Sequence, residues 1–248
     1  MIATTELKGR LGNNFYQIAT CIAYAKRNGL EYHIPTFSPH MAGGANLFEI
    51  KENSKPQAHW YAINERTTEG NCKVSGVYSP PQAHADGNVM LKGYWQSFKY
   101  FEDYREDVLQ AFDIPSYAGL GAVSIHVRRA DYLHLPAFDT LPMNYYDKCI
   151  AYFKERGYKK FMVFSDDMPY CYENFKHPGC EFIFSDGNEF QDFVYMANCE
   201  HHITANSSFS FAAAWLNRNP DKIVLCPDER YCWFNTDYIP EYYTKIPC

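Results

Sequence analysis

The chain has 248 residues, of which 46% are hydrophobic and 17% aromatic, so it can bury a core as one large domain or two small ones. Its formal net charge of −6 gives no general attraction to nucleic acid or anionic lipid, and we exclude both as partners. Any anionic substrate must therefore be held by a local basic cluster. We expect neither a signal peptide nor a membrane span.

The nine cysteines are scattered and are never spaced Cys-x-x-Cys. This pattern favours buried thiols in a reducing compartment over a disulfide framework or a closed zinc site. We therefore expect a cytoplasmic protein that binds no metal.

The first expected strand is Met1 to Leu7, and it is followed by a loop that contains Gly9 and Gly12. Apolar residues then recur at helical spacing: Phe15, Ile18, Ala19, Ile22 and Ala25. A strand, a glycine-rich loop and a helix in this order form a ligand loop. The alternative is an ordinary helix cap by Asn13 or Asn14 after a tight turn, and the residues alone leave the two readings even.

The middle of the chain is less regular. We expect a second strand at 30–34 and another at 89–96, followed by a helix from about 97 to 111. Residues 36–88 are rich in Pro, Gly, Asn and Ser and predict no element, although they could hold the acceptor loops. Pro and Gly cluster again at 113–119, which predicts a linker between an N-terminal α/β domain, 1–115, and a C-terminal domain, 116–248.

Beyond the linker, expected strands alternate with expected helices. The strands are 122–127, 160–164, 180–184, 201–205 and, as the last, 222–226; the helices are 142–156, 189–199 and 207–216. This alternation predicts parallel βαβ units with right-handed crossovers, and hence a Rossmann-like domain.

The strand at 122–127 ends in charge, with His126 and Arg128 on one face. Two adjacent guanidiniums at a strand exit need anionic partners. For Arg129 we expect a structural carboxylate, with Asp131 as the nearest candidate. For Arg128 we favour a phosphate, because it shares a face with an imidazole at the carboxyl end of a strand, where open α/β sheets bind ligands.

A second anion site is predicted at Asn206-Ser207-Ser208-Phe209-Ser210, where a strand gives way to a helix. Backbone N–H groups at a helix start and the serine hydroxyls are donors for an anion. The alternative is that a serine caps the helix, and both can hold at once. Asp192 lies on the preceding helix, and a carboxylate suits the adjacent N–H donors of guanine, but by itself it is an unremarkable acidic residue.

Several of these stretches resemble the α-1,2-fucosyltransferases. His126-x-Arg128-Arg129-x-Asp131 matches the His-x-Arg-Arg-x-Asp motif of α-1,2- and α-1,6-fucosyltransferases, and Leu11-Gly-Asn-Asn resembles their Leu-Gly-Asn-Gln opening. Residues 94–96 (Tyr-Trp-Gln) and 189–216 also follow family segments, the latter with Ala-Asn-Ser-Ser-Phe-Ser. The chain is similar to glycosyltransferase family 11 over most of its length, with 36–88 excepted.

The resemblance implies an α/β, GT-B-like fold with two Rossmann-like halves and the donor site in the C-terminal half. It implies an inverting, metal-independent transfer of L-fucose from GDP-β-L-fucose to a hydroxyl of a glycan, with O2 of a galactose as the expected acceptor. Stabilisation of the departing diphosphate matters most for such a reaction, because a cation-like sugar develops as the C1–O bond breaks.

By the same resemblance, each candidate residue receives a role. Arg128, Ser207 and the Ser208-Phe209 backbone hold the phosphates; His126 and Asp192 face the nucleoside; Asp166 or Asp167 touches ribose; Asp131 orients the arginines; and Asn13, with Arg10 and Gly12, reaches towards fucose. No carboxylate is singled out as the general base.

The sequence departs from the family at Asn14, at Ala130, and at Phe211 and Ala212, where the family prefers Gln, Gly and two Trp. These differences bear on acceptor and linkage more than on the donor. Two alternatives stay open: a transferase of the same donor class that acts on a protein hydroxyl or another sugar, and a nucleotide-sugar or glycan binding module without turnover.

Overall fold

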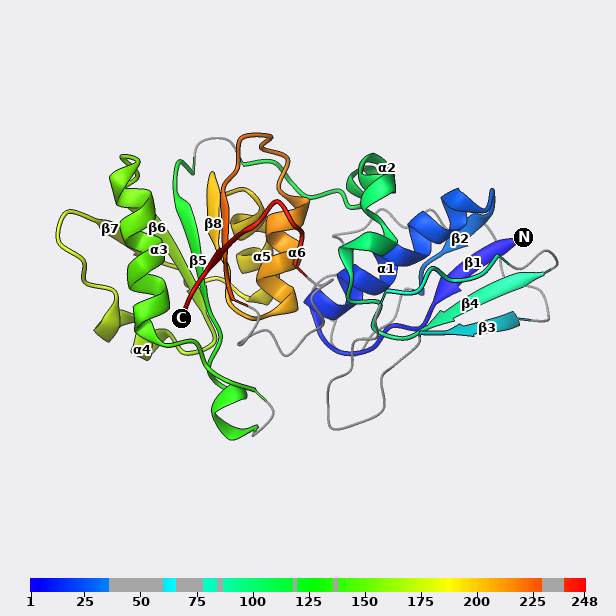
Figure 1. The fold of residues 1–248 in the computed structure, drawn as a ribbon, viewed down its shortest axis with the longest axis horizontal. Coiled ribbons are helices and arrows are strands. Elements are labelled where there is room, and N and C mark those ends of the chain that lie inside the picture. The colour runs from blue at the N-terminus through cyan, green and yellow to red at the C-terminus, as the bar shows by residue number, and fades with distance from the viewer. Residues whose placement is uncertain (36–59, 66–77, 84–86, 118–119, 136–137, 229–238) are drawn as a thin grey trace. The chain divides into compact units, whose positions relative to one another are not determined.

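The computed structural model describes residues 1–35, 60–65, 78–83, 87–117, 120–135, 138–228 and 239–248. The chain divides into two compact units (Figure 1). The first comprises 1–114 with a short segment that ends at Pro240, and the second comprises 115–233 and 241–248. The division falls in the expected linker, but the chain also returns late to the first unit.

The first unit contains a four-stranded sheet in the order β2-β1-β4-β3, and every pair in it is parallel. Its strands are β1 (Ile2–Thr5), β2 (Glu31–His33), β3 (Trp60–Asn64) and β4 (Asn88–Lys92). The sequence predicted all of these except β3. That strand lies at the sheet edge and is partly exposed along its whole length, so it lacks the alternation that marks a half-buried strand.

Helix α1 (Leu11–Arg27) is buried along most of its length and packs on β1. The ring of Phe15 lies 5.5 Å from that of Phe101 and 5.2 Å from that of Phe112. The helix expected at 97–111 is wrong in its first half, where two short 3-10 turns precede α2 (Arg105–Ala111). Tyr100 and Phe101 are both buried there, and the Ser97 side chain caps the first of the two turns.

The second unit contains a six-stranded sheet in the order β10-β9-β8-β5-β6-β7, and every pair in it is parallel. Its strands are β5 (Val123–Val127), β6 (Lys160–Ser165), β7 (Glu181–Phe184), β8 (His201–Ile203), β9 (Val224–Pro227) and β10 (Thr244–Ile246). Numbered within the unit, the order is that of the doubly wound Rossmann fold. The sequence predicted β9 as the last strand and did not predict β10, which is short and exposed.

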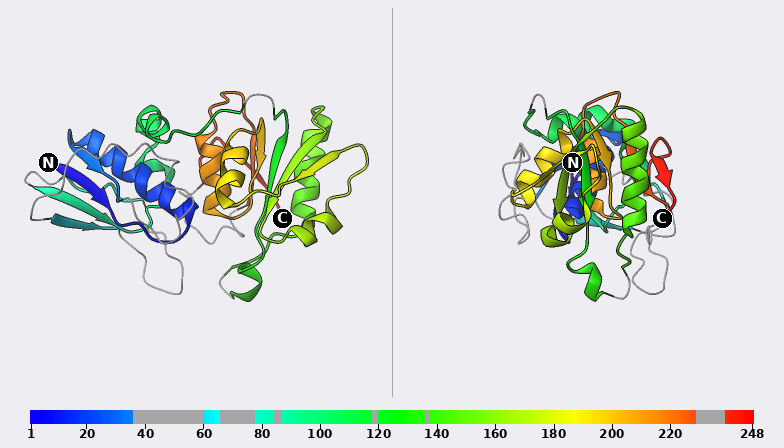
Figure 2. Two further views of the ribbon diagram at one scale, coloured as in Figure 1. Left: turned by 180° about the vertical axis from the view of Figure 1, so that it is seen from behind. Right: turned by 90° about the vertical axis from the view of Figure 1, so that its left-hand side faces the viewer.

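Four helices connect these strands: α3 (Met143–Glu155), α4 (Met168–Asn174), α5 (Glu189–Ala197) and α6 (Ser208–Leu216). Figure 2 shows α3 and α5 on opposite faces of the sheet. The buried side of α3, with Tyr145, Ile150 and Phe153, packs on Ile125 and Phe161. Helix α6 is buried from Ser210 to Leu216, which explains why its sequence is apolar all round. The sequence did not predict α4, which has only seven residues.

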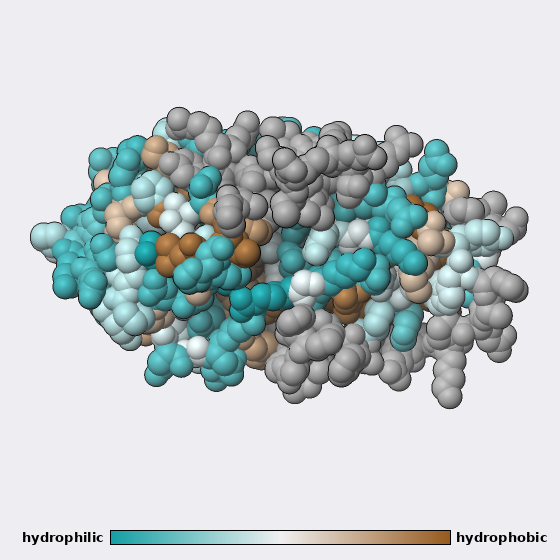
Figure 3. Space-filling model, turned by 90° about the horizontal axis from the view of Figure 1, so that it is seen from below, coloured by the Kyte–Doolittle hydropathy of each residue, from teal (hydrophilic) through white to brown (hydrophobic). Residues whose placement is uncertain are grey.

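Among the described residues, no helix combines the length and the apolar character that crossing a bilayer requires. Figure 3 shows a face on which hydrophobic residues form small groups within a largely hydrophilic surface. Large exposed apolar side chains of the second unit include Leu133 and Leu135, which lie in the loop after β5.

Candidate active site

The site is built on two neighbouring strands of the second unit. β5 pairs in parallel with β8, with Ser124 opposite His202 and Ile125 opposite Ile203. On the far side of β5 the sheet continues to β6 and β7, and on the far side of β8 it continues to β9 and β10. The strand order therefore reverses between β5 and β8, and open α/β sheets bind their ligands at the carboxyl ends of the strands at such a point.

Arg128 follows β5 directly, and two carboxylates hold its guanidinium. Its Nη2 lies 2.6 Å from Oδ2 of Asp131, and its Nη1 lies 2.9 Å from Oδ2 of Asp166. The Arg128 side chain is 13% exposed, whereas that of Asp131 is 46% exposed. The guanidinium also lies 5.3 Å from the ring centre of Tyr132. Arg128 is thus oriented at the strand end, with one of its two anionic partners open to solvent.

Arg129 contacts a structural carboxylate, but it is not that of Asp131, the nearest one in the sequence. Its Nε donates to Oδ2 of Asp167 at 3.0 Å, and its guanidinium stacks at 3.6 Å over the ring of Tyr170. The expected pairing with Asp131 is wrong because Asp131 contacts Arg128 instead. Asp167 is the N-cap of α4, so Arg129 fastens the start of that helix to the end of β5.

Asp166 was expected, with Asp167 as the alternative, to touch ribose. In the structure its Oδ1 accepts hydrogen bonds from the backbone N–H groups of Arg129, at 2.8 Å, and Ala130, at 3.2 Å, while Oδ2 pairs with Arg128. The carboxylate therefore shapes the turn after β5 and orients the arginine. Sequence spacing did not show this role, because Asp166 directly follows β6, the strand that pairs with β5.

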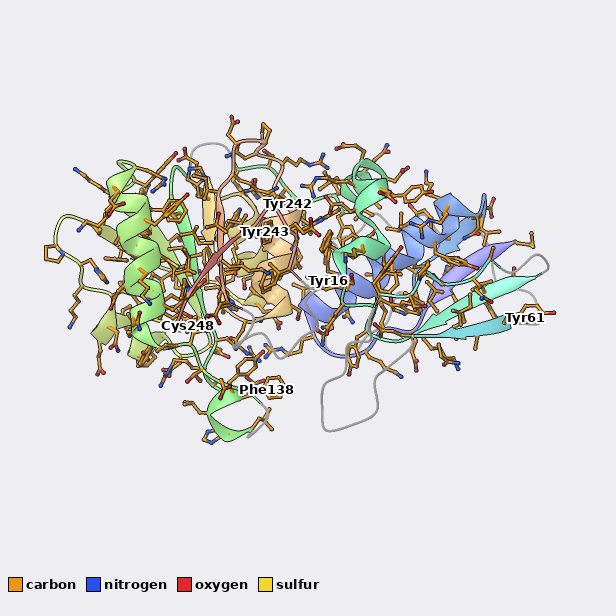
Figure 4. All side chains as sticks on the ribbon, viewed as in Figure 1. Tyr16, Tyr61, Phe138, Tyr242, Tyr243 and Cys248 are labelled. Atoms are coloured by element: carbon orange, nitrogen blue, oxygen red, sulfur yellow. The ribbon has the colours of Figure 1, made fainter. Side chains whose placement is uncertain are left out.

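The loop after β5 is tied to the turn after β8. The hydroxyl of Tyr132 donates to the carbonyl oxygen of Asn206 at 3.2 Å, and Asn206 Nδ2 donates to the carbonyl oxygen of Asp139 at 2.8 Å. The ring of Tyr132 also packs 4.6 Å from that of Phe138, which is labelled in Figure 4. The sequence did not predict a role for Tyr132, because a single aromatic residue in a loop produces no periodic pattern.

The turn after β8 caps α6 and reaches His126 of β5. The Ser207 side chain accepts from the backbone N–H of Phe209 at 3.4 Å, so the capping role considered for this serine is real. The Phe209 ring lies 5.3 Å from the His126 imidazole and 5.3 Å from the Phe193 ring of α5. The ring of Phe209 therefore packs beside His126, and Ser207 caps the turn that carries Phe209.

Asp192 lies in the first turn of α5, and its surroundings were not predicted. The Ser185 hydroxyl donates a short hydrogen bond to its Oδ1. A Cβ added to Gly187 would lie 2.8 Å from the same oxygen, so only glycine leaves room for the carboxylate there. Burial raises the pKa of Asp192 to about 6, with smaller contributions from Asp186 and Glu189, against the lowering effect of Ser185.

The glycine-rich loop of the first unit precedes α1, as expected. Arg10 is the N-cap of that helix and makes no side-chain cap, and Gly12 and Asn13 lie in its first turn, so capping by an asparagine is ruled out. Gly9 has φ +76, a conformation that favours glycine. The Asn13 side-chain oxygen accepts from Gln96 Nε2 at 2.7 Å.

Asn14 stabilises the same loop from the inside of the unit. Its Nδ2 donates to the carbonyl oxygen of Lys8 at 3.1 Å, and the side chain of Gln17 bonds both the N–H and the C=O of Lys8. Asn14 is buried, whereas Asn13 keeps partial exposure. Only the latter is therefore available to a ligand.

No group of three or more His, Cys, Asp or Glu side chains suited to a metal is found among the described residues. The cysteines in that part of the chain are free thiols and largely buried, with Cys72 and Cys232 outside the described residues. Burial raises the pKa of Cys171 to about 11, so it is a packing residue.

The sequence of this chain matches one known protein family. Residues 1–232 match the sequence profile of glycosyl transferase family 11. The chain belongs to glycosyltransferase family 11. The resemblance carried by the sequence motifs is thereby confirmed.

Two relatives and one solved structure are similar to this family 11 protein. It is 32% identical to an alpha-1,2-colitosyltransferase of Escherichia coli over 99% of each chain. It is 27% identical to the galactoside alpha-(1,2)-fucosyltransferase 2 of Hylobates lar over 86% of this chain and 68% of the relative. The fucosyltransferase NodZ from Bradyrhizobium is 11% identical and superposes with a TM-score of 0.54 over 86% of this chain and 92% of NodZ. These comparisons confirm the expected GT-B-like α/β fold of this family 11 chain.

Proposed function

We propose that this family 11 protein is an inverting, metal-independent fucosyltransferase that transfers L-fucose from GDP-β-L-fucose to a glycan hydroxyl, O2 of a galactose. The observation that carries the proposal is the switch point between β5 and β8, where Arg128 and the Ser207–Phe209 turn belong to adjacent parallel strands. The galactoside alpha-(1,2)-fucosyltransferase among its relatives supports the sugar, the acceptor and the linkage.

The proposed donor site lies in the second unit. Arg128 and the backbone N–H groups at the start of α6 stabilise the negative charge that develops on the departing diphosphate. Asp131 is the partner of Arg128 that a diphosphate oxygen displaces, since it is the more exposed of the two carboxylates. Asp166 then keeps the guanidinium oriented while the phosphate binds.

The nucleoside contacts come from three neighbouring elements. The His126 and Phe209 rings, 5.3 Å apart, offer apolar surface to the guanosine, and the Asp192 carboxylate accepts from N1–H and N2–H of guanine. In the first unit, we assign Asn13, with Arg10 and Gly12, to the sugar of the donor.

A second candidate donor keeps the same site but carries colitose. The relative that aligns with 99% of both chains is an alpha-1,2-colitosyltransferase, and its identity to this chain, 32%, exceeds the 27% of the fucosyltransferase from Hylobates lar. A donor with colitosyl in place of fucosyl would use the same diphosphate and guanine contacts. The two donors are separated by offering each to the enzyme with one acceptor.

The decisive experiment measures transfer by mass. The protein is incubated with GDP-fucose, lactose and EDTA, and we expect lactose to gain one fucosyl residue while GDP is released. Arg128→Ala should fold normally, because Asp166 keeps its two backbone donors, and should form no product. A glycan or nucleotide-sugar binding module would give neither product nor slow hydrolysis of the donor, and an active Arg128→Ala variant would remove the phosphate role. Galactose-free and peptide acceptors test the alternative acceptors.

A further inference from the structure

The carboxyl end of β4 in the first unit makes an unusual turn. Gly93 has φ +154 and Trp95 has φ +55, and Trp95 is the only residue other than glycine with positive φ among the described part of the chain. Bulky side chains rarely adopt this conformation, and it persists only where surrounding contacts impose it. A specific contact must therefore hold the turn.

Glu65, the residue after β3, provides that contact. Its Oε2 accepts hydrogen bonds from the backbone N–H groups of Tyr94, at 2.7 Å, and Trp95, at 3.0 Å. Glu65 is 8% exposed, and its own N–H donates to the carbonyl oxygen of Lys92 at 2.8 Å. A Cβ on Gly93 would lie 2.4 Å from the Cβ of Glu65, so the glycine is what lets the carboxylate approach.

The held turn aims Gln96 at the glycine-rich loop. Gln96 is 5% exposed and donates from Nε2 to Oδ1 of Asn13 at 2.7 Å. On the other side, a Cβ added to Gly9 would lie 2.2 Å from Nδ2 of Asn13. The Asn13 side chain therefore lies between Gln96, which follows β4, and Gly9, which follows β1. Its oxygen accepts the hydrogen bond from Gln96.

We propose that Glu65 and Gln96 are positioning residues for transfer: Glu65 sets the turn after β4, and through it Gln96 fixes the rotamer and the amide orientation of Asn13. This inference rests on the proposed function, which assigns Asn13 to the sugar of the donor. Misplacement of a substrate-contacting group by about 1 Å costs up to about a hundredfold in rate. A residue that merely stabilised the unit would instead lower the melting temperature and leave the rate of the folded enzyme unchanged.

The test is a double-mutant cycle on kcat. Gln96→Met keeps the side-chain volume but removes the donor, and we expect kcat to fall by about tenfold to a hundredfold while the Kd for GDP stays within about twofold. In an Asn13→Ala background, Gln96→Met should have no further effect on kcat. A wild-type kcat for Gln96→Met, or a full additive loss in the Asn13→Ala background, would overturn the inference. Absence of transfer by the wild-type protein would instead refute the proposed function.

Glu65 is tested by a graded pair with a matched control. Glu65→Gln keeps an oxygen that accepts both N–H bonds, whereas Glu65→Met keeps none, so we expect kcat to fall in the order wild type, Gln, Met. Glu106→Met changes an exposed glutamate of the same unit and should leave kcat unchanged. Equal kcat values for the two Glu65 variants would contradict the proposal. If Glu65→Met does not fold, the kcat of Glu65→Gln and the double-mutant cycle of Gln96 with Asn13 still test the proposal.

Discussion

Asp192 shows how one residue acquires its chemistry from its surroundings. It belongs to the first turn of α5, where the helix dipole favours a negative charge, yet burial raises its pKa to about 6. The Ser185 hydroxyl, seven residues earlier, is the contact that limits this rise. The carboxyl thus titrates just below neutrality, where its ionised form is available to a ligand that brings two N–H donors.

We expect the affinity for GDP to depend on pH through this residue. In the proposed site the ionised carboxylate binds guanine, so we expect the affinity to be full above pH about 6 and to decline as the pH falls through that value, by about tenfold at pH 5. Isothermal titration calorimetry from pH 5 to 8 measures the Kd. Asp192→Asn should weaken binding at pH 8 by about 1.5–3 kcal/mol, the usual value for hydrogen bonds to a charged group.

Asp192→Asn also serves as the control, because the terminal phosphate of GDP titrates in the same range. The variant reports the phosphate contribution alone, and its pH dependence should be shallower than that of the wild type. Identical slopes for the two proteins would show that Asp192 does not meet the guanine. Gly187→Ala, whose Cβ would lie 2.8 Å from the Asp192 carboxylate oxygen, should weaken GDP binding in the same way.

At the scale of an element, the start of α6 serves both folding and the proposed binding. Ser207 has the extended backbone of an N-cap, and its hydroxyl accepts from the N–H of Phe209. The helix is buried from Ser210 to Leu216, so the core fixes the position of its first turn. The turn thereby presents its remaining donors at a constant place, next to the end of β5.

A pair of substitutions at Ser207 separates the two roles. Ser207→Ala should lower the free energy of unfolding by about 0.5–2 kcal/mol, whereas Ser207→Gly should lower it by only a few tenths, because glycine is an acceptable N-cap. If the hydroxyl also binds phosphate, both variants lose the same affinity for GDP despite their different stabilities. Chemical denaturation and calorimetry measure the two quantities. Affinity that followed stability would leave Ser207 with the capping role alone.

For the whole molecule, the proposed nucleotide contacts all belong to the second unit. Ligand that binds only the folded state adds about 2.7 kcal/mol at a concentration of one hundred times Kd, and this stabilisation is independent of any acceptor. The sheet that carries these contacts is parallel and is covered by helices on both faces.

We therefore expect GDP to raise the melting temperature of the protein by several degrees without added metal. ADP at the same concentration should not, because adenine lacks the adjacent N1–H and N2–H donors that Asp192 accepts. Differential scanning fluorimetry in the presence of EDTA measures both shifts. Equal shifts with GDP and ADP would refute the guanine assignment, and a GDP shift that required Mg²⁺ would refute metal independence.

Much of the fold follows from local pattern. Apolar residues at strand and helix spacing predicted β5, α3, β6, β7, α5, β8 and α6 within a few residues, because these elements bury one face or all faces in the core. The motif at His126–Asp131 and the turn at Asn206–Ser210 were also visible in the sequence. Exposed or short elements, β3, α4 and β10, were missed since they bury too little apolar surface to leave a pattern.

The sequence by itself determined which segments are strands and helices, which residues at their ends are polar, and which family the chain resembles, because each of these depends on neighbours along the chain. The tertiary structure alone decided the distant partners: Arg128 with Asp166, Tyr132 with Asn206, and Gln96 with Asn13 across 83 residues. The physical reason is strand order. A buried polar group must find its hydrogen bond on whichever strand lies beside its own, and adjacency in a parallel sheet is set by crossovers rather than by sequence distance.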